Sequence, residues 1–274
     1  MKKILSLAMA LAVLAACAKK EGETPAAKPE TSASKPAETS AAAPTPSAPA
    51  PQTQESKPFV IPPAAKKQAK YFPEGTPSRA IQDLDDMLDS YYVDPQTPEQ
   101  RKYNEDLKSA VIKGTFDIRE LCRLALDKHW AERTPQEQDA FVDLMIRLLE
   151  KKAIFSKEQG QKKAEKKKSK TVYQVTYEGD KPLTPDQTAL AMSLVRIPSE
   201  SLKIELNYKL KKDSASSAQG GGWKVFDVIV DGASLLDNYK YQFDKIIAKE
   251  GYPSLINRMG TKLQELQQKD QPQK

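Results

Sequence analysis

The spacing of apolar residues changes once along this chain, and that change limits the folds open to it. From about residue 76 to residue 155, apolar side chains recur every three or four positions, as in amphipathic helices. From residue 172 to residue 230 they recur at every second position, as in strands with one buried face. Helices are expected again from Ser234 and Pro253. The order of helices, strands and helices predicts an α+β domain with helices packed on one face of a curved sheet.

The helices are expected to begin at clear capping signals. A side chain that accepts a hydrogen bond from the first turn precedes each apolar run, with Pro or an acidic residue after it. These caps are Thr76, Thr97, Asp117 and Thr134 in the first part, and Ser234 after the strands. Gly114 is expected to close the second helix. The acidic pair Asp85 and Asp86 is expected on the solvated face of the first helix.

Four strands are expected between the two sets of helices. Their connections are short and polar, which favours hairpins and therefore a four-stranded antiparallel meander. In the third strand, Ile204, Leu206 and Tyr208 share one face with Leu210, and Lys203 and Glu205 lie on the other. The expected ranges are 172–177, 190–197, 202–210 and 223–230.

The first 16 residues have the pattern of a signal peptide. Lys2 and Lys3 precede the apolar run Ile4–Ala16, which is too short to span a bilayer. Leu14–Cys17 resembles the bacterial lipobox, in which the Cys is acylated and becomes the first mature residue. Lipidation of Cys17, with palmitate among the acyl chains, would anchor the protein outside the cytoplasm. An ordinary signal peptide with an incidental Cys is the alternative interpretation.

The segment after the cysteine is too poor in apolar residues to fold. It consists mainly of Ala, Pro, Ser, Thr, Glu and Lys. We therefore expect a signal peptide over 1–16, the lipidated Cys17 with a disordered linker over 17–73, a folded domain over 74–268 and a disordered tail over 269–274. Cys122 is the second of two Cys residues and is expected to be a buried, unreactive thiol.

No motif in the sequence indicates catalysis, a cofactor or a metal site. His129 is the only histidine, which excludes arrangements that need two histidines, and there is no phosphate-binding loop. The formal net charge is +6, but the lysine run over 162–170 has no interleaved aromatic residues, so nucleic-acid binding is not indicated. That run is interpreted as a solvated loop, with contact to an anionic membrane surface as the alternative.

Two stretches resemble the MlaC, or toluene-tolerance, family of periplasmic phospholipid-binding proteins. The first is "GGGWKVFDVIVDGASLLDNYKYQFDKIIAKEGYPSLINRM", residues 220–259, and the second is "FDIRELCRLALDKHWAERTPQEQDAFVDLMIRLL", residues 116–149. The resemblance implies an NTF2-like or cystatin-like α+β fold that encloses an apolar cavity for the acyl chains of a phospholipid. It also implies a carrier, not an enzyme, that transports lipid between an outer-membrane lipoprotein complex and an inner-membrane ABC-type transporter and so maintains lipid asymmetry.

Three departures from the family pattern affect this interpretation. Asp127 stands where the family commonly has Gly, and "AIF" at 153–155 replaces the usual tyrosine after the long helix. Family members are typically soluble shuttles, whereas this chain has a lipobox and a linker. Ala18 after the Cys resembles an outer-membrane sorting signal. We therefore expect a carrier tethered to the periplasmic side of the envelope, with a high effective concentration at one membrane.

Alternation along the strands, together with the resemblance, selects the candidate lipid-binding residues. The same residues would form the core of any α+β domain, so a scaffold lipoprotein with a filled pocket is an open alternative. A sterol-like lipid or a hopanoid would satisfy the same apolar argument, and an enzyme acting on envelope lipids is a third, weaker possibility. The candidates are Tyr173, Val175, Tyr177, Ile204, Leu206, Tyr208, Phe226, Val228 and Val230 on the strands, and Leu144, Met145 and Leu148 on the helix after Thr134.

Overall fold

The computed structural model describes most of the chain after residue 67. The described residues are 59–60, 68–92, 95, 97–152, 174–184, 187–198, 201–213 and 222–269. The expected signal peptide, Cys17, most of the linker, the lysine run and the "AIF" segment lie outside them, as does Tyr173. None of the described helices is long and apolar enough to cross a membrane.

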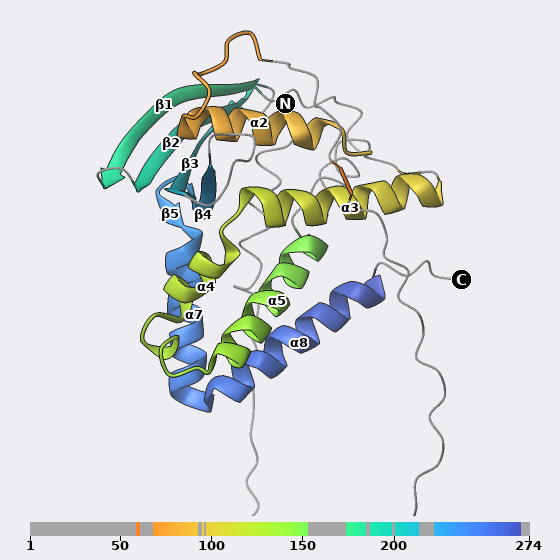
Figure 1. The fold of residues 1–274 in the computed structure, drawn as a ribbon, viewed down its shortest axis with the longest axis vertical. Helices are drawn as coiled ribbons and strands as arrows, with labels where there is room; N and C mark the ends of the chain where they lie inside the picture. Colours follow the sequence, from red (N-terminus) through yellow and green to blue (C-terminus); the bar gives the residue numbers. More distant parts are fainter. Residues whose placement is uncertain are drawn as a thin grey trace, which may run out of the picture. The chain divides into compact units, whose positions relative to one another are not determined.

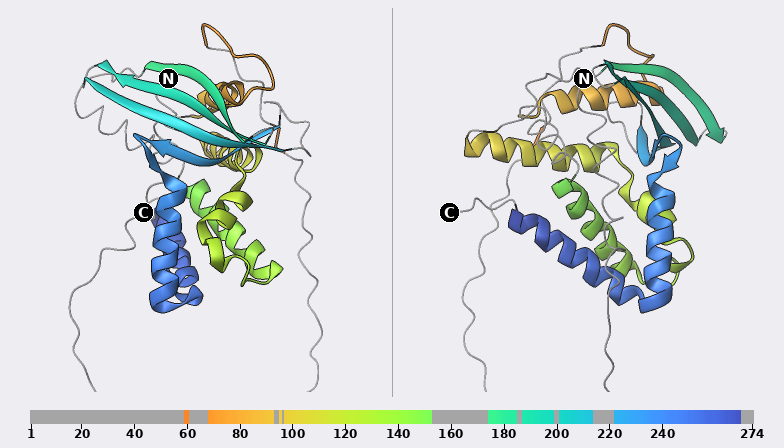
Figure 2. Two further views of the ribbon diagram at one scale, coloured as in Figure 1. Left: turned by 90° about the vertical axis from the view of Figure 1, so that its left-hand side faces the viewer. Right: turned by 180° about the vertical axis from the view of Figure 1, so that it is seen from behind.

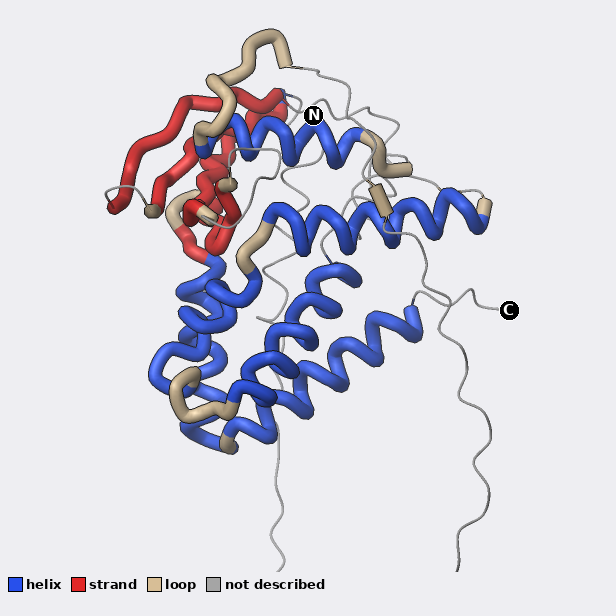
Figure 3. Tube along the Cα trace, viewed as in Figure 1, coloured by secondary structure: helices blue, strands red, loops and turns tan. Residues whose placement is uncertain are grey.

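Helices and strands follow one another in the expected order (Figures 1 and 3). The first group of helices precedes a five-stranded sheet, and two further helices follow it. The helices are α2 (Pro77–Asp89), α3 (Pro98–Thr115), α4 (Ile118–Leu126), the short 3₁₀ helix η2 (Asp127–His129) and α5 (Pro135–Lys152), then α7 (Leu235–Glu250) and α8 (Tyr252–Lys269). The strands are β1 (Gln174–Thr184), β2 (Thr188–Ile197), β3 (Leu202–Lys212), β4 (Trp223–Val230) and β5 (Ala233–Ser234).

The predicted caps are confirmed. Thr97 forms a reciprocal capping box with Gln100, and Thr134 forms the same pair of bonds with Glu137. In the other three helices the side chains of Thr76, Asp117 and Ser234 accept a hydrogen bond from a backbone N–H of the first turn. Each cap satisfies donors that a helix start leaves unpaired, which fixes where the helix begins.

The sheet is an antiparallel meander in the order β1-β2-β3-β4-β5, so the α+β prediction is confirmed, and the described residues form five strands where four were expected. The added strand, β5, is only two residues long and pairs with the end of β4. β1 extends well beyond the expected end at Tyr177 because bulges near residues 178 and 183 let it follow β2 to Thr184. The long strands β1 to β4 lie side by side (Figure 2).

The helices pack on the sheet and on one another around one continuous apolar cluster. α2 lies along β1 and β2, and α4 and α7 pack against β4. α5 packs between α3, α4 and α8, and Gly251, with φ +82°, makes the turn from α7 into α8 (Figure 1). A short bridge from Phe116 to Val225, together with the bond from the Asp117 N–H to the Val225 carbonyl (2.9 Å), ties the α3–α4 junction to β4.

Two details differ from the expectations. α3 continues one residue past Gly114 and ends at Thr115, with Phe116 as its C-cap. Asp85 and Asp86 are not solvated: they are 4% and 5% exposed, because a preceding segment of the chain and β1 lie against α2. The amphipathic pattern of α2 therefore does not separate a solvated side from a buried side.

Candidate functional site

The inner face of the sheet, which faces α2 and the core, brings most of the candidate residues together. Residues that lie opposite one another in an antiparallel pair share a face, so the strand register assigns each side chain. Leu206 lies opposite Ser193 and Val230, and Tyr208 lies opposite Ala191 and Val228. By the same register the inner face contains Val175, Tyr177, Ile204, Leu206, Tyr208, Val228 and Val230.

Phe226 departs from the expected alternation. A bulge beside Lys209 and Leu210 places Val225, not Phe226, opposite Leu210. Phe226 is the extra residue of this bulge and is still buried. Both aromatic and aliphatic side chains at this end of β4 therefore belong to the core.

The candidate residues on α5 belong to the same apolar cluster but not to the layer directly over the strands. Met145 and Leu148 are buried and Leu144 is half-buried. α5 packs chiefly on α3, α4 and α8, whereas α2 lies over β1 and β2. Small buried side chains on β2, Ala191 and Ser193, leave room for α2 to approach the sheet.

Exposure divides the candidates into two groups. Leu206 and Met145 have 0% exposed surface, so no space large enough for a water molecule lies against them. Ile204, Tyr208, Val228 and Leu148 are at most 4% exposed and are likewise packed by protein atoms. The half-buried candidates are Leu144, Val175, Tyr177 and Val230, which are packed against the edge of the cluster.

Sequence reasoning missed a set of buried polar groups between α2 and the inner face of the sheet. The Tyr177 hydroxyl donates to Asp85 Oδ2 (3.0 Å), and the Gln68 amide donates to the same oxygen (3.2 Å). The Tyr208 hydroxyl is buried nearby and has no hydrogen-bond partner among the described residues. Burial, and then the Asp85 carboxylate, raises the pKa of both tyrosines, so each phenol is protonated across the physiological range.

The segment 68–76 also binds polar side chains of α2. The Tyr71 hydroxyl donates to Asp86 Oδ2 (2.5 Å), and the Phe72 N–H donates to Gln82 Oε1 (2.9 Å). The Arg79 guanidinium lies 4.9 Å above the centre of the Tyr71 ring. We call this segment the strap, because it satisfies buried polar side chains of α2; it also contacts the sheet, where Trp223 Nε1 donates to the Gly75 carbonyl oxygen (2.9 Å).

A surface hollow of about 400 Å³ lies between the end of α4, η2 and α7. Two ion pairs cross its lining, Lys128 with Asp244 (2.9 Å) and Lys240 with Asp127 (3.1 Å). Hydrogen bonds from Lys128 and His129 lower the pKa of Asp244. Charged side chains dominate this hollow, which therefore does not suit an acyl chain.

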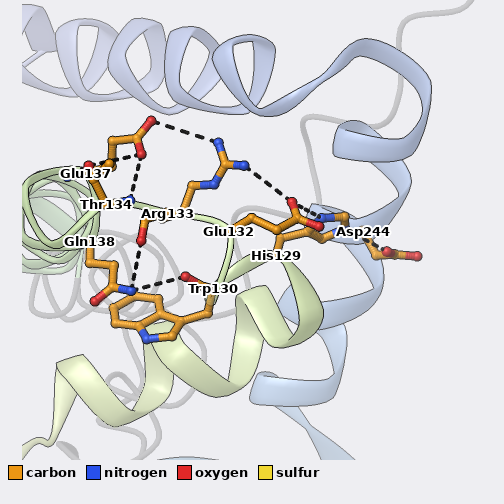
Figure 4. Close-up of polar contacts among 8 residues, drawn as sticks. All are labelled: His129, Trp130, Glu132, Arg133, Thr134, Glu137, Gln138 and Asp244. Atoms are coloured by element: carbon orange, nitrogen blue, oxygen red, sulfur yellow. Dashed lines mark hydrogen bonds and ion pairs between the residues drawn. The ribbon is translucent and has the colours of Figure 1, made fainter.

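His129 is part of a structural network beside that hollow (Figure 4). Its Nε2 lies 3.0 Å from Asp244 Oδ1 on α7, and its Nδ1 lies 3.4 Å from Glu132 Oε2. The Gln138 amide donates to the carbonyl oxygens of Trp130 and Arg133 (3.1 and 3.2 Å). These contacts fix the connection between α4 and α5 onto α7, and the groups that they bring to the imidazole are carboxylates, not a Ser, Thr or Cys side chain.

Cys122 is fully buried, and burial raises the pKa of its thiol, as expected for an unreactive core residue. Among the residues that the structure describes, no three His, Cys, Asp or Glu side chains are placed to hold a metal ion.

Comparisons with known proteins agree with this architecture. A crystal structure described as the phospholipid-binding protein from Ralstonia solanacearum in complex with a phospholipid matches with a TM-score of 0.50 at 21% sequence identity. The match covers 69% of this chain and 97% of that one. No curated protein sequence matches significantly. The model of the MlaC protein family matches residues 82–261, from within α2 to within α8 and thus most of the chain, and the chain therefore belongs to the MlaC family.

Proposed function

We propose that this protein binds a phospholipid and carries it between membranes without covalent chemistry. The observation that carries the proposal is that the chain belongs to the MlaC family and has the fold of a protein solved with a phospholipid. The apolar inner face of the sheet, covered by helices, supports it further. Transfer would exchange burial in a membrane for burial in the protein, and each CH₂ left in water would cost about 0.8 kcal/mol.

We place the ligand against the half-buried part of the apolar cluster. The fully packed side chains have no free surface to offer, whereas Val175, Tyr177, Val230 and Leu144 each keep part of theirs. The fully buried candidates would then support the wall of the site from behind. A ligand can touch these four half-buried residues without unpacking the core.

The tether is the second part of the proposal. Acylation of Cys17 would hold the protein on the periplasmic side of the outer membrane, and the linker would let the folded domain reach partners. Strap residues from 68 onward bond to α2, so we assign them to the folded domain. An outer-membrane lipoprotein complex and an inner-membrane ABC-type transporter are the proposed partners, and maintenance of lipid asymmetry is the proposed role.

One observation favours a second candidate, a scaffold lipoprotein with a filled interior. Several candidate residues are packed by the protein's own atoms, as they would be in an ordinary core. The two functions differ in what co-purifies with the chain, because only a carrier needs a stable ligand.

Native mass spectrometry with lipid extraction tests the proposal. The chain from Ala18 onward, secreted to a periplasm and purified without detergent, is expected to retain about one phospholipid. A single ligand-free mass, unchanged after incubation with liposomes, would contradict the carrier function and favour the scaffold.

A matched pair of variants locates the ligand. Val230 and Ile229 are adjacent half-buried residues on β4, and the register places them on opposite faces of the sheet. Val230→Trp is expected to lower the bound lipid fraction at least about threefold, whereas Ile229→Trp leaves it unchanged. Equal lipid occupancy in the two variants would place the ligand elsewhere.

A further inference from the structure

The outer face of the sheet carries the large apolar side chains of β2. Buried Ala191, Ser193 and Val195 face the core, so alternation places Leu190, Met192 and Leu194 on the other side. These three residues are half-buried and are not part of the core cluster. Among the described elements, α2 is the helix that packs extensively on β2, and it does so on the inner face. In Figure 1 α2 overlaps the right-hand part of the sheet, and the other labelled helices lie to its right or below it.

Mostly cationic side chains flank this apolar row on the neighbouring strands, with one carboxylate, Glu205 on β3, opposite Leu194. Lys181 on β1 lies opposite Leu190, and Lys203 on β3 lies directly opposite Arg196 at the end of the row. No described carboxylate forms an ion pair with Lys181, Arg196 or Lys203. By contrast, Lys209 pairs with Asp227 (3.0 Å) and Lys211 pairs with Glu120 (3.2 Å).

The juxtaposition of Arg196 and Lys203 points to an anionic partner. Like charges directly opposite each other on one face of a sheet destabilise the strand pair. The Arg196 guanidinium is held by the Thr176 hydroxyl (3.3 Å), which does not neutralise it. A phosphate group between the two cations would remove the repulsion and satisfy both donors.

We propose that the outer-face patch, defined as Leu190, Met192, Leu194, Arg196 and Lys203, docks the folded domain onto an anionic phospholipid bilayer. The apolar row spans about 13 Å along one strand, which suits shallow insertion at the level of the headgroups. The long Arg and Lys side chains keep their charges among the phosphates while their stems cover apolar surface. The inference goes beyond the proposed function, because a carrier can receive lipid from a protein complex without touching a bilayer.

Two other occupants fit the patch less well. A second copy of the chain would bring two sets of unpaired cations together, which like-charge repulsion disfavours. A row one strand wide is also too small to be the core of a standard protein interface, which buries about 800 Å² on each partner. An anionic bilayer does not repel the cations, and it can adapt to a narrow, curved surface.

Vesicle flotation tests the docking. The chain from Ala18 onward retains every described residue and lacks the expected lipid anchor. At low salt it is expected to float with vesicles that contain phosphatidylglycerol and not with pure phosphatidylcholine vesicles. The double variant Arg196→Glu with Lys203→Glu is expected to lower the partition coefficient at least about tenfold, and Met192→Asp about fivefold.

A matched double variant controls for net charge. Lys102→Glu with Lys113→Glu makes the same charge change on α3, where both side chains are well exposed. It is expected to keep vesicle binding within about twofold, and circular dichroism melting curves check that all variants fold. Equal losses in the two double variants, or no flotation of the unaltered chain with anionic vesicles, would overturn the proposal. Vesicle binding that the patch variants leave intact would overturn it too, and would leave an acidic protein as the occupant.

Lipid occupancy, measured on the same preparations, separates this inference from the proposed function. Patch variants that retain their bound phospholipid but no longer float support docking as a separate property. A ligand-free chain that still floats through the patch would refute the carrier function and leave the docking intact.

Discussion

The two helical parts of the domain bury their side chains in different ways. α2 buries polar groups, since Arg79, Gln82, Asp85 and Asp86 are all less than 9% exposed. The layer of α4, α5, α7 and α8 instead buries aromatic rings: Phe141 meets Phe243 edge to face at 5.7 Å, and Tyr239 stacks on Phe243 at the same distance. Directional hydrogen bonds fix the position of α2, whereas the volume and shape of the side chains fix the packing of the aromatic layer.

This difference has a functional consequence for the inner face. The side chains of the aromatic layer can pack closely without hydrogen-bond partners. The carboxylates of α2, in contrast, depend on the strap and on Tyr177 for their hydrogen bonds. The strap continues directly from the linker, so the chain that would connect the domain to its anchor also completes the packing of α2. Loss of an aromatic ring should therefore destabilise one part, and loss of a buried hydrogen-bond acceptor the other.

The largest effect is expected in the aromatic layer. Phe243 is 1% exposed and contacts both Phe141 and Tyr239, so Phe243→Ala would leave a large cavity. We expect the free energy of unfolding to fall by about 3–5 kcal/mol in urea titrations followed by circular dichroism. Tyr241→Ala, on the same helix but 69% exposed, is the control and should change it by less than about 0.5 kcal/mol. Similar values for the two variants would show that the layer is loosely packed.

The next effect is expected in the polar layer. Asp85→Ala would leave the Tyr177 hydroxyl and the Gln68 amide without their acceptor, at a cost of about 2 kcal/mol in the same titration. Asp85→Asn keeps an acceptor oxygen and should lose less. Asp106, whose partner Lys102 is exposed, provides the control, and Asp106→Ala should cost less than about 1 kcal/mol. A more stable Asp85→Ala variant would mean that desolvation of the carboxylate outweighs its hydrogen bonds.

Helix starts and the strand meander could be predicted because their signals are local. The Thr97 and Gln100 capping box needs only residues three positions apart, and the alternation around Leu206 needs only one strand. The burial of Asp85 could not be predicted in this way, because it depends on Gln68 and on Tyr177, which lies 92 residues away in the sequence. A solvated and a strapped helix have the same pattern of apolar residues.

The sequence predicted which residues belong to the candidate site, but not which of them keep exposed surface. Leu206 and Val230 have the same alternation, yet Leu206 is fully packed and Val230 is half-buried at the edge of the cluster. Their exposure differs because of where the helices lie over the sheet. The sequence of a single strand does not contain this information. The bulge that removes Phe226 from the inner row likewise depends on how β4 pairs with β3.

A smaller effect is expected at the end of α4, next to the aromatic layer. Asp127 has φ +49° and ψ −120°, a conformation that side chains with a Cβ disfavour, at the position where the family commonly has Gly. Asp127→Gly should raise the free energy of unfolding by about 1 kcal/mol, although it removes the exposed pair with Lys240. Asp127→Ala keeps the Cβ and should give no gain. A gain in both variants would assign the effect to the lost charge and not to the backbone.

The smallest effect is expected where the helical layer meets the sheet. Glu120 on α4 accepts hydrogen bonds from Arg123 (2.7 Å) and from Lys211 on β3 (3.2 Å), and these bonds lower its pKa below the ordinary value of 4.5. The stabilisation is therefore complete above pH 4.5 and is lost as the pH falls through the lower pKa of the folded state. Because these partners are partly exposed, we expect less than about 1 kcal/mol. The free energy of unfolding of Glu120→Gln, measured from pH 7 downward, should approach that of the unaltered chain at low pH, and the exposed control Glu105→Gln should change the value at pH 7 by less than about 0.5 kcal/mol. A deficit in Glu120→Gln that stays constant down to low pH would show that this contact between α4 and the sheet does not set the pH dependence.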